Sequence, residues 1–177
     1  LFVDKDAAGA THDGKSWATA YTTLQEALDW TNAHGSSIFE IWVAEGVYYP
    51  DLGGIHTANA QSESFRINYD NVQVYGGFGG TETLRSQRNP AVHPTILSGD
   101  VDGDDTNNDG NSIAETSADI QASNAYHVLW LDGETNEAIT AATVLDGFII
   151  TAGQANSGYL ETRGGGFYCN GYGSDKG

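Results

Sequence analysis

The residues most suited to chemistry lie in one short acidic segment, SGDVDGDDTNNDGNS, which spans residues 98–112. Five of its residues are aspartates within ten positions, and no lysine or arginine occurs between Arg88 and Arg163. Like charges at this density repel one another strongly unless a cation or solvent lies between them. Calcium binds about six to eight oxygen atoms from carboxylates, amides and carbonyls. The segment therefore predicts a Ca2+ site.

Two overlapping ligand patterns run through this segment. The first, D-x-D-x-D, spans residues 100–104, but Asp105 stands where the calcium loop of an EF-hand has glycine. The second spans residues 105–110 and matches D-x-[DN]-x-[DN]-G, whereas Thr116 stands where that loop has its bidentate glutamate. The segment is thus a calcium-loop-like sequence and not an EF-hand. The candidate ligands are Asp100, Asp102, Asp104, Asp105, Asn107 and Asp109.

A second interpretation of the segment stays open. A solvated acidic loop that only keeps the chain soluble would have the same composition. Zinc is disfavoured, because the segment contains neither cysteine nor histidine. If calcium binds the folded chain alone, it stabilises the fold by mass action, so removal of the metal should lower the melting temperature.

Charge and composition limit the classes of function. The chain has 177 residues, with 24 acidic and 7 basic residues and a formal net charge of −17, which disfavours binding to nucleic acid or to an anionic membrane. A hydrophobic content of 39% favours a folded domain. No apolar run approaches the ~20 residues that span a bilayer, so we expect no membrane insertion. The only cysteine, Cys169, excludes an internal disulfide, and we expect a small buried apolar side chain there.

One helix is predicted, in the segment TTLQEALDWTNAHG. Thr23 and Glu26 form a capping-box pattern, and Gly35 stands where a helix C-terminus is expected. The helical spacing places one stripe of residues on the same face. These residues are Leu24, Ala27, Leu28 and Thr31. An amphipathic helix of this kind must cover an apolar surface.

The rest of the chain is predicted to form short strands rich in β-branched and aromatic residues. The segments are 38–49, 65–78, 95–99, 126–131, 143–153 and 164–171. No helix recurs between them, which disfavours a βαβ sheet, and no tight Asn-Gly hairpin joins neighbours, which disfavours a sandwich. The remaining fold class is a solenoid of stacked coils. The sequence intervals between Val128, Val144 and Phe167 indicate about 20 residues in each coil. The amphipathic helix would cap its first coil.

Six motifs, in order, resemble those of bacterial extracellular right-handed parallel β-helix proteins, which are related to polymorphic outer-membrane and choice-of-anchor proteins. The motifs are LFVDKDAAGATHDGKSWATAYTTLQEAL, EIWVAEGVYYP, YGGFGGTET with SQRNP, TILSGDVDGDD, VLDGFIITAG and GGGFYCNG. The resemblance covers roughly residues 2–171. It implies an all-β, right-handed parallel β-helix with an N-terminal capping α-helix. We expect a cap over residues 1–37 and opening coils over 38–177, with an acidic insertion at 98–125, in one continuous domain that belongs to a longer protein.

The resemblance also implies a secreted or cell-surface location. We expect a calcium-stabilised structural or adhesive module that assembles with an extracellular protein, a glycan or further copies of itself. Polysaccharide lyases and pectin hydrolases share this architecture, so the alternatives are a carbohydrate-active enzyme and a non-catalytic glycan-binding module. Asp132 and Asp146 are the candidate pair for glycoside hydrolysis. Both lie in a recurring LDG, which favours a repeated turn, so we expect no catalysis.

Overall fold

The computed structural model describes residues 1–35, 37, 39–158 and 162–171. Ile38 and residues 172–177, which belong to the predicted β-helix part, lie outside the described residues. Among the described residues there is one α-helix, and short strands follow it as predicted, but one strand, at Phe2–Val3, precedes the helix and was not predicted. Within the described part of the chain, no helix is long and apolar enough to cross a membrane.

The predicted capping helix is confirmed as α1, Leu24–His34. The Thr23 side chain accepts from the Glu26 backbone N–H and the Glu26 carboxylate accepts from the Thr23 N–H, so the capping box is complete. Gly35 ends the helix with a positive φ of 71°. The predicted stripe of four residues is buried, and α1 packs against β1, β2 and β4.

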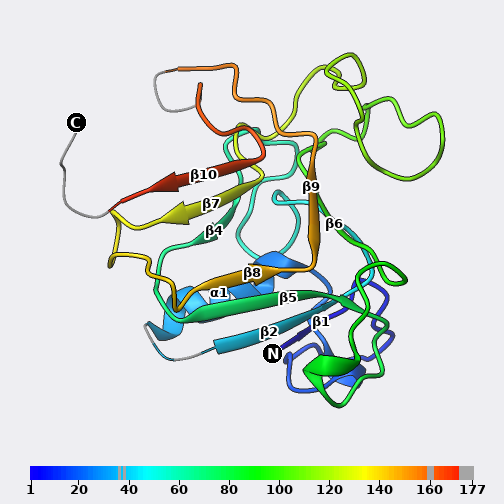
Figure 1. Ribbon diagram of the computed structural model, residues 1–177, viewed down its shortest axis with the longest axis vertical. Helices are drawn as coiled ribbons and strands as arrows, with labels where there is room; N and C mark the ends of the chain where they lie inside the picture. The colour runs from blue at the N-terminus through cyan, green and yellow to red at the C-terminus, as the bar shows by residue number, and fades with distance from the viewer. Residues whose placement is uncertain (36, 38, 159–161, 172–177) are drawn as a thin grey trace.

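The strands form three parallel sheets, which confirms the predicted β-helix (Figure 1). The first sheet has the order β1-β2-β5-β8, the second β3-β6-β9 and the third β4-β7-β10. Three coils, formed by β2–β4, β5–β7 and β8–β10, therefore contribute one strand each to every sheet, and β1 adds a fourth strand to the first sheet at the capped end. The bounds are β1 Phe2–Val3, β2 Phe39–Ala44, β3 Gly46–Tyr48, β4 Phe65–Ile67, β5 Val72–Phe78, β6 Thr95–Ser98, β7 Leu129–Asp132, β8 Val144–Asp146, β9 Phe148–Thr151 and β10 Phe167–Asn170. Two short 3-10 helices, η1 Trp17–Thr19 and η2 Arg85–Gln87, lie in the connections.

Each coil contains more residues than the sequence spacing of the strands predicted. Val144 lies in the first sheet, whereas Phe167 pairs with Leu129 in the third, so one coil runs from Leu129 to Phe167. Three of the predicted segments also divide at corners between sheets. Gly46 and Gly147 have φ values of 136° and 86° at two of these corners, a conformation that glycine adopts without steric cost.

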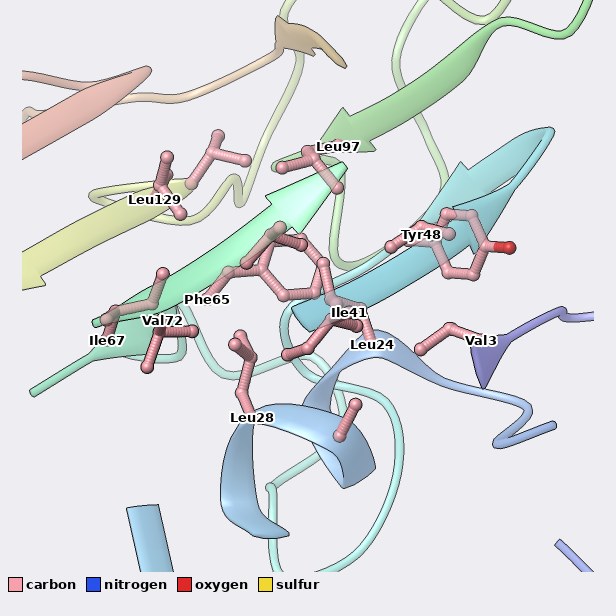
Figure 2. Packing of buried hydrophobic residues seen from close by; sticks show 14 residues of the cluster. Val3, Leu24, Leu28, Ile41, Tyr48, Phe65, Ile67, Val72, Leu97 and Leu129 are labelled. Carbon is pink, nitrogen blue, oxygen red and sulfur yellow. The ribbon is translucent and has the colours of Figure 1, made fainter. Parts of the chain in front are cut away.

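Side chains stack in columns along the interior of the coils. Phe65 in β4 is aligned with Leu129 in β7, and Leu129 is aligned with Phe167 in β10. In the second sheet Leu97 is aligned with Ile150. Figure 2 shows Phe65 and Leu97 in the buried cluster between the sheets, with Leu28 of α1 entering from the capped end.

The opposite end of the stack is open among the described residues. Strands β8, β9 and β10 each pair with a neighbour on one side only. Ile150 is 38% exposed and Phe167 is 45% exposed, although both continue interior columns. Cys169 is also exposed, so the prediction of a buried cysteine is wrong. It continues the column of Leu131, and its position on the last described coil leaves it accessible.

Successive coils approach so closely at Gly76 that a side chain has no room. A Cβ at Gly76 would lie 2.5 Å from the carbonyl oxygen of Gly147 in the next coil. We expect Gly76→Ala to force the two backbones apart and to lower the free energy of unfolding by about 1–3 kcal/mol. Gly171→Ala is the control, because a Cβ there meets nothing within 4 Å. Thermal denaturation of both variants tests this, and equal melting temperatures would show that the coils are not in close contact at Gly76.

Candidate metal centre

The acidic insertion leaves and re-enters the coils at adjacent points. It follows β6, and Asp100 at its start forms an antiparallel bridge with Asn124 at its end. The Ala125 N–H donates to the Gly99 carbonyl at 2.7 Å. The insertion therefore projects as a loop with a closed base, seen in green beyond the sheets in Figure 1.

Three of the predicted ligands converge at this base. Ligand oxygens of Asp100, Asp104 and Asp105 all lie within 4.8 Å of one another. The turn that gathers them is held by Asp100, whose Oδ1 accepts from the Gly103 N–H at 2.9 Å and the Asp104 N–H at 3.1 Å. Gly103 has a φ of 73°, which suits glycine. We call these three carboxylates the Asp triad, and it could hold a metal ion.

The electrostatics of the Asp triad favour a positive charge. Burial and then the neighbouring charge of Asp105 raise the pKa of Asp100, although backbone N–H groups partly offset this. Loss of hydration and then the charge and hydrogen bonding of Asp102 raise the pKa of Asp104. The negative charges therefore destabilise one another at neutral pH, and a bound cation would reverse that effect.

The other three predicted ligands lie outside the triad. Asp102 Oδ2 accepts from the Ser123 N–H at 3.3 Å. Asn107 Oδ1 accepts from the Ser112 N–H at 3.1 Å. Asp109 accepts from the Asn111 N–H at 3.2 Å and from its side-chain amide at 2.8 Å. Metal binding by these three residues stays a prediction.

A cavity of about 250 Å3 adjoins the Asp triad. Its lining combines the insertion with the coils. The residues include Tyr49, Ser98, Asp100, Asp105, Asn107 and Ala114. Two further lining residues, Ser112 and Ala152, have positive φ values of 62° and 61° without being glycine. Backbone strain of this kind is concentrated at functional sites.

Asn124 is a site residue that the sequence analysis missed. It is fully buried, and its Nδ2 donates to Asp105 Oδ2 at 2.7 Å and to the Ala152 carbonyl at 2.8 Å. Its Oδ1 is buried without a hydrogen-bond partner. Asn124 thus fixes the Asp105 carboxylate against the end of β9. Nothing in the local sequence marks it, because the contact joins positions 19 residues apart.

The candidate pair for glycoside hydrolysis is not a pair in the structure. Asp132 ends β7 in the third sheet, whereas Asp146 ends β8 in the first. Asp132 is 1% exposed and accepts from Arg66 Nε at 2.8 Å, while Asp146 accepts from Arg88. Each carboxylate therefore forms an ion pair with a different arginine, as expected for residues that stabilise the fold.

Comparisons with family models, with curated proteins and with solved structures found no match. The structure itself shows a parallel β-helix architecture, in its three stacked parallel sheets.

Proposed function

We propose that this chain is a secreted or cell-surface β-helix module that is stabilised by calcium and that scaffolds or joins extracellular partners without catalysis. The observation that carries this proposal is the convergence of Asp100, Asp104 and Asp105 within 4.8 Å at the base of the insertion. A cation there would join the insertion to the coil stack. The surface that projects from the coils would then be held in one shape for contact with a protein or glycan.

The donor set supports calcium over a transition metal. The triad and the cavity beside it offer carboxylate, amide and hydroxyl oxygens, including those of Asn107 and Ser98. Calcium is coordinated by such oxygen atoms, while zinc prefers cysteine and histidine. Asp100 also accepts two backbone N–H bonds, so its carboxylate is already oriented before a metal arrives.

The two acidic residues considered for glycoside hydrolysis support a structural role over a catalytic one. Asp132 and Asp146 are each occupied by an arginine from the preceding coil. The Arg66 guanidinium also lies 4.5 Å from the centre of the Trp130 ring in β7. Both ion pairs therefore link neighbouring coils, which supports a structural role for these two carboxylates.

Direct calcium binding tests the proposal. We expect isothermal titration to detect calcium binding to the wild-type chain and Asp104→Asn to weaken it about tenfold, since ligand charge sets the affinity of such sites. Asp119→Asn is the matched control, because it removes the same charge from the same insertion, lies outside the triad and is not one of the six candidate ligands. Equal weakening by both variants would indicate a diffuse electrostatic effect. Absence of binding to the wild-type chain would overturn the calcium site.

A terbium measurement locates the ion. Terbium replaces calcium at oxygen sites and emits when a nearby tyrosine is excited, and Tyr49 lines the cavity together with Asp100 and Asp105. We expect calcium-displaceable terbium emission from the wild-type chain and a large loss of it in Tyr49→Phe. Unchanged emission in Tyr49→Phe would place the ion elsewhere.

A groove over the first sheet favours a second function, non-catalytic glycan binding. Its lining includes Glu40, Trp42 and Arg85, which combine an aromatic surface with charged hydrogen-bonding groups. Side chains of these types contact sugar rings and hydroxyls. Retention on a glycan array without release of products would support this function. Release of products would instead identify an enzyme.

Self-association through the open end is the remaining proposal about partners. Unpaired edges of β8, β9 and β10 are surfaces on which another chain can add strands. Analytical ultracentrifugation at increasing protein concentration tests this, and a monomer at every concentration would exclude it.

A further inference from the structure

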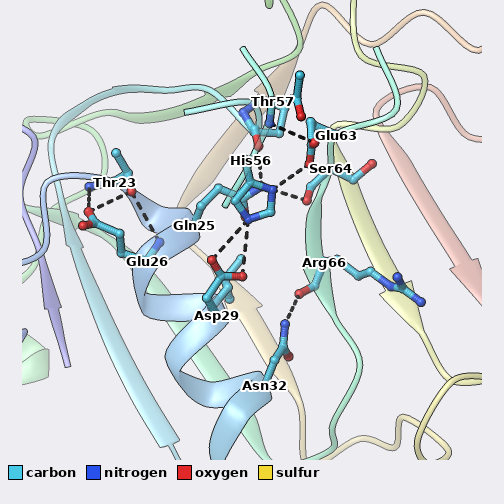
Figure 3. Close-up of polar contacts among 12 residues, drawn as sticks. Thr23, Gln25, Glu26, Asp29, Asn32, His56, Thr57, Glu63, Ser64 and Arg66 are labelled. Carbon is cyan, nitrogen blue, oxygen red and sulfur yellow. Dashed lines mark hydrogen bonds and ion pairs between the residues drawn. The ribbon is translucent and has the colours of Figure 1, made fainter. Parts of the chain in front are cut away.

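A histidine held between two carboxylates joins the capping helix to the loop that precedes β4. His56 lies in this loop, residues 51–64, and its ring points between Asp29 of α1 and Glu63 of the loop (Figure 3). The His56 Nδ1 lies 2.6 Å from Glu63 Oε2, and its Nε2 lies 3.3 Å from Asp29 Oδ1. The imidazole side chain is 15% exposed.

This geometry requires a proton on each ring nitrogen. An ionised carboxylate only accepts hydrogen bonds, so both His56 nitrogens must donate to make both contacts. Gln25 Nε2 is a further neighbour of His56 Nδ1, at 3.4 Å. Glu63 is much closer, so its carboxylate accepts the hydrogen bond that Nδ1 donates. The contacts therefore describe an imidazolium between two carboxylates.

The contacts around His56 connect two parts of the fold. Glu63 Oε1 accepts from the Thr57 N–H at 3.1 Å, which closes the loop on itself. Gln25 of α1 donates to the Ser64 carbonyl at 3.1 Å and also to the Pro50 carbonyl. The loop is thus fixed to α1 at both of its ends by Gln25 and near its centre by His56.

We propose that His56 is a pH-responsive latch that fastens the centre of loop 51–64 to the capping helix while its ring is an imidazolium and releases this central contact when the ring loses a proton. With a neutral ring, only one nitrogen can donate, so one of the two carboxylates loses its partner. The contact to Asp29 is the longer one and joins separate elements. Its loss would therefore loosen the cap.

The direction of the pH dependence follows from the groups that face the ring. Burial alone would lower the pKa of His56, but the Glu63 hydrogen bond and the Asp29 carboxylate outweigh burial and raise it above 6.5. These acids are the titratable groups that contact His56 from α1 and from the loop. A raised pKa means that the latch contributes fully below about pH 6.5 and that its contribution is lost as pH rises through the pKa of the folded state.

An NMR titration of the His56 ring in the wild-type chain tests the charge state directly. We expect a midpoint above that of an unperturbed histidine and a lower midpoint in both Glu63→Gln and Asp29→Asn. We also expect the Thr57 amide to exchange faster above the midpoint, after correction for the intrinsic rate. A wild-type midpoint at or below about 6.5 would overturn the latch.

The pH dependence of unfolding tests the energetic role. We expect the wild-type chain to lose stability as pH rises through the midpoint, and His56→Gln to lose this dependence. The change in the unfolding equilibrium constant across the titration equals the factor by which folding tightens proton binding to the ring. His34→Gln is the control, because His34 lies on α1, the helix that His56 contacts, but itself contacts only the Trp30 carbonyl and ring among the contacts described. A pH dependence that persists in His56→Gln would refute the latch, and if that variant does not fold, the wild-type titration decides.

Discussion

Calcium at a hundredfold excess over its dissociation constant should raise the melting temperature of the wild-type chain by about 5–10 °C. This follows from about 2.7 kcal/mol of stabilisation by mass action and from about 2–4 °C per kcal/mol in a domain of this size. The structural reason is that the Asp triad lies where the insertion meets the coils, with Asp105 attached through Asn124 to the end of β9. A bound ion would therefore oppose unfolding of the coils as well as of the loop.

Differential scanning calorimetry with calcium and with a chelator measures this effect. Asp104→Asn should reduce the rise in melting temperature, while Asp119→Asn should retain it, since Asp119 lies outside the triad and is not one of the candidate ligands. Removal of one charge from the triad should also raise the melting temperature of the metal-free chain, because loss of hydration and then the neighbouring carboxylates raise the pKa of Asp104. Identical melting curves with calcium and with chelator would favour the solvated acidic loop.

Phe65→Ala should be the most destabilising single substitution considered, with a loss of about 3–5 kcal/mol in the free energy of unfolding. Phe65 is 0% exposed and belongs to the cluster that joins α1 to the interior columns (Figure 2). Replacement by alanine removes a ring around which coils and cap are packed. The surrounding strands cannot close the resulting cavity, because their spacing is set by hydrogen bonds.

Phe167→Ala is a matched control for this prediction. Phe167 occupies the same column as Phe65, through Leu129, but is 45% exposed on the last described coil. We expect it to lose about 1 kcal/mol or less, because nearly half of the residue is already in water. Urea denaturation of both variants measures the difference. Equal losses would mean that the last coil is covered as fully as the central one.

The regular parts of the fold were predictable because their signals are local. The capping box of Thr23 and Glu26 and the stop at Gly35 lie within a few residues of the bonds they make, and α1 begins and ends as predicted. The apolar segments correctly marked the strands that follow the helix, whereas the two-residue strand β1 was missed because it is too short to show a pattern. The corners at Gly46 and Gly147 were missed, since a strand that turns into the next sheet keeps the same β-rich composition on both sides.

The assembly of the candidate site was less predictable. Sequence spacing suggested two ligand patterns, but convergence depends on the path of the chain, which gathers Asp100 with Asp104 and Asp105 and directs Asp109 toward Asn111. Asn124 and His56 act through partners that are distant in sequence, Asp105 and Asp29. Contacts of this type leave no periodic signal, so only the folded coils reveal them.

The closed base of the insertion has a consequence for engineering and for evolution. Because the loop departs and returns at the bridged residues Asp100 and Asn124, its two ends are held at a fixed separation. Doubling the length of such a loop costs only about 0.6 kcal/mol of closure entropy. Foreign peptides or whole small domains could therefore be grafted between these anchor points while the strands keep their alignment. For the same reason, we expect the sequence of this insertion to vary more among natural variants than the residues of the interior columns.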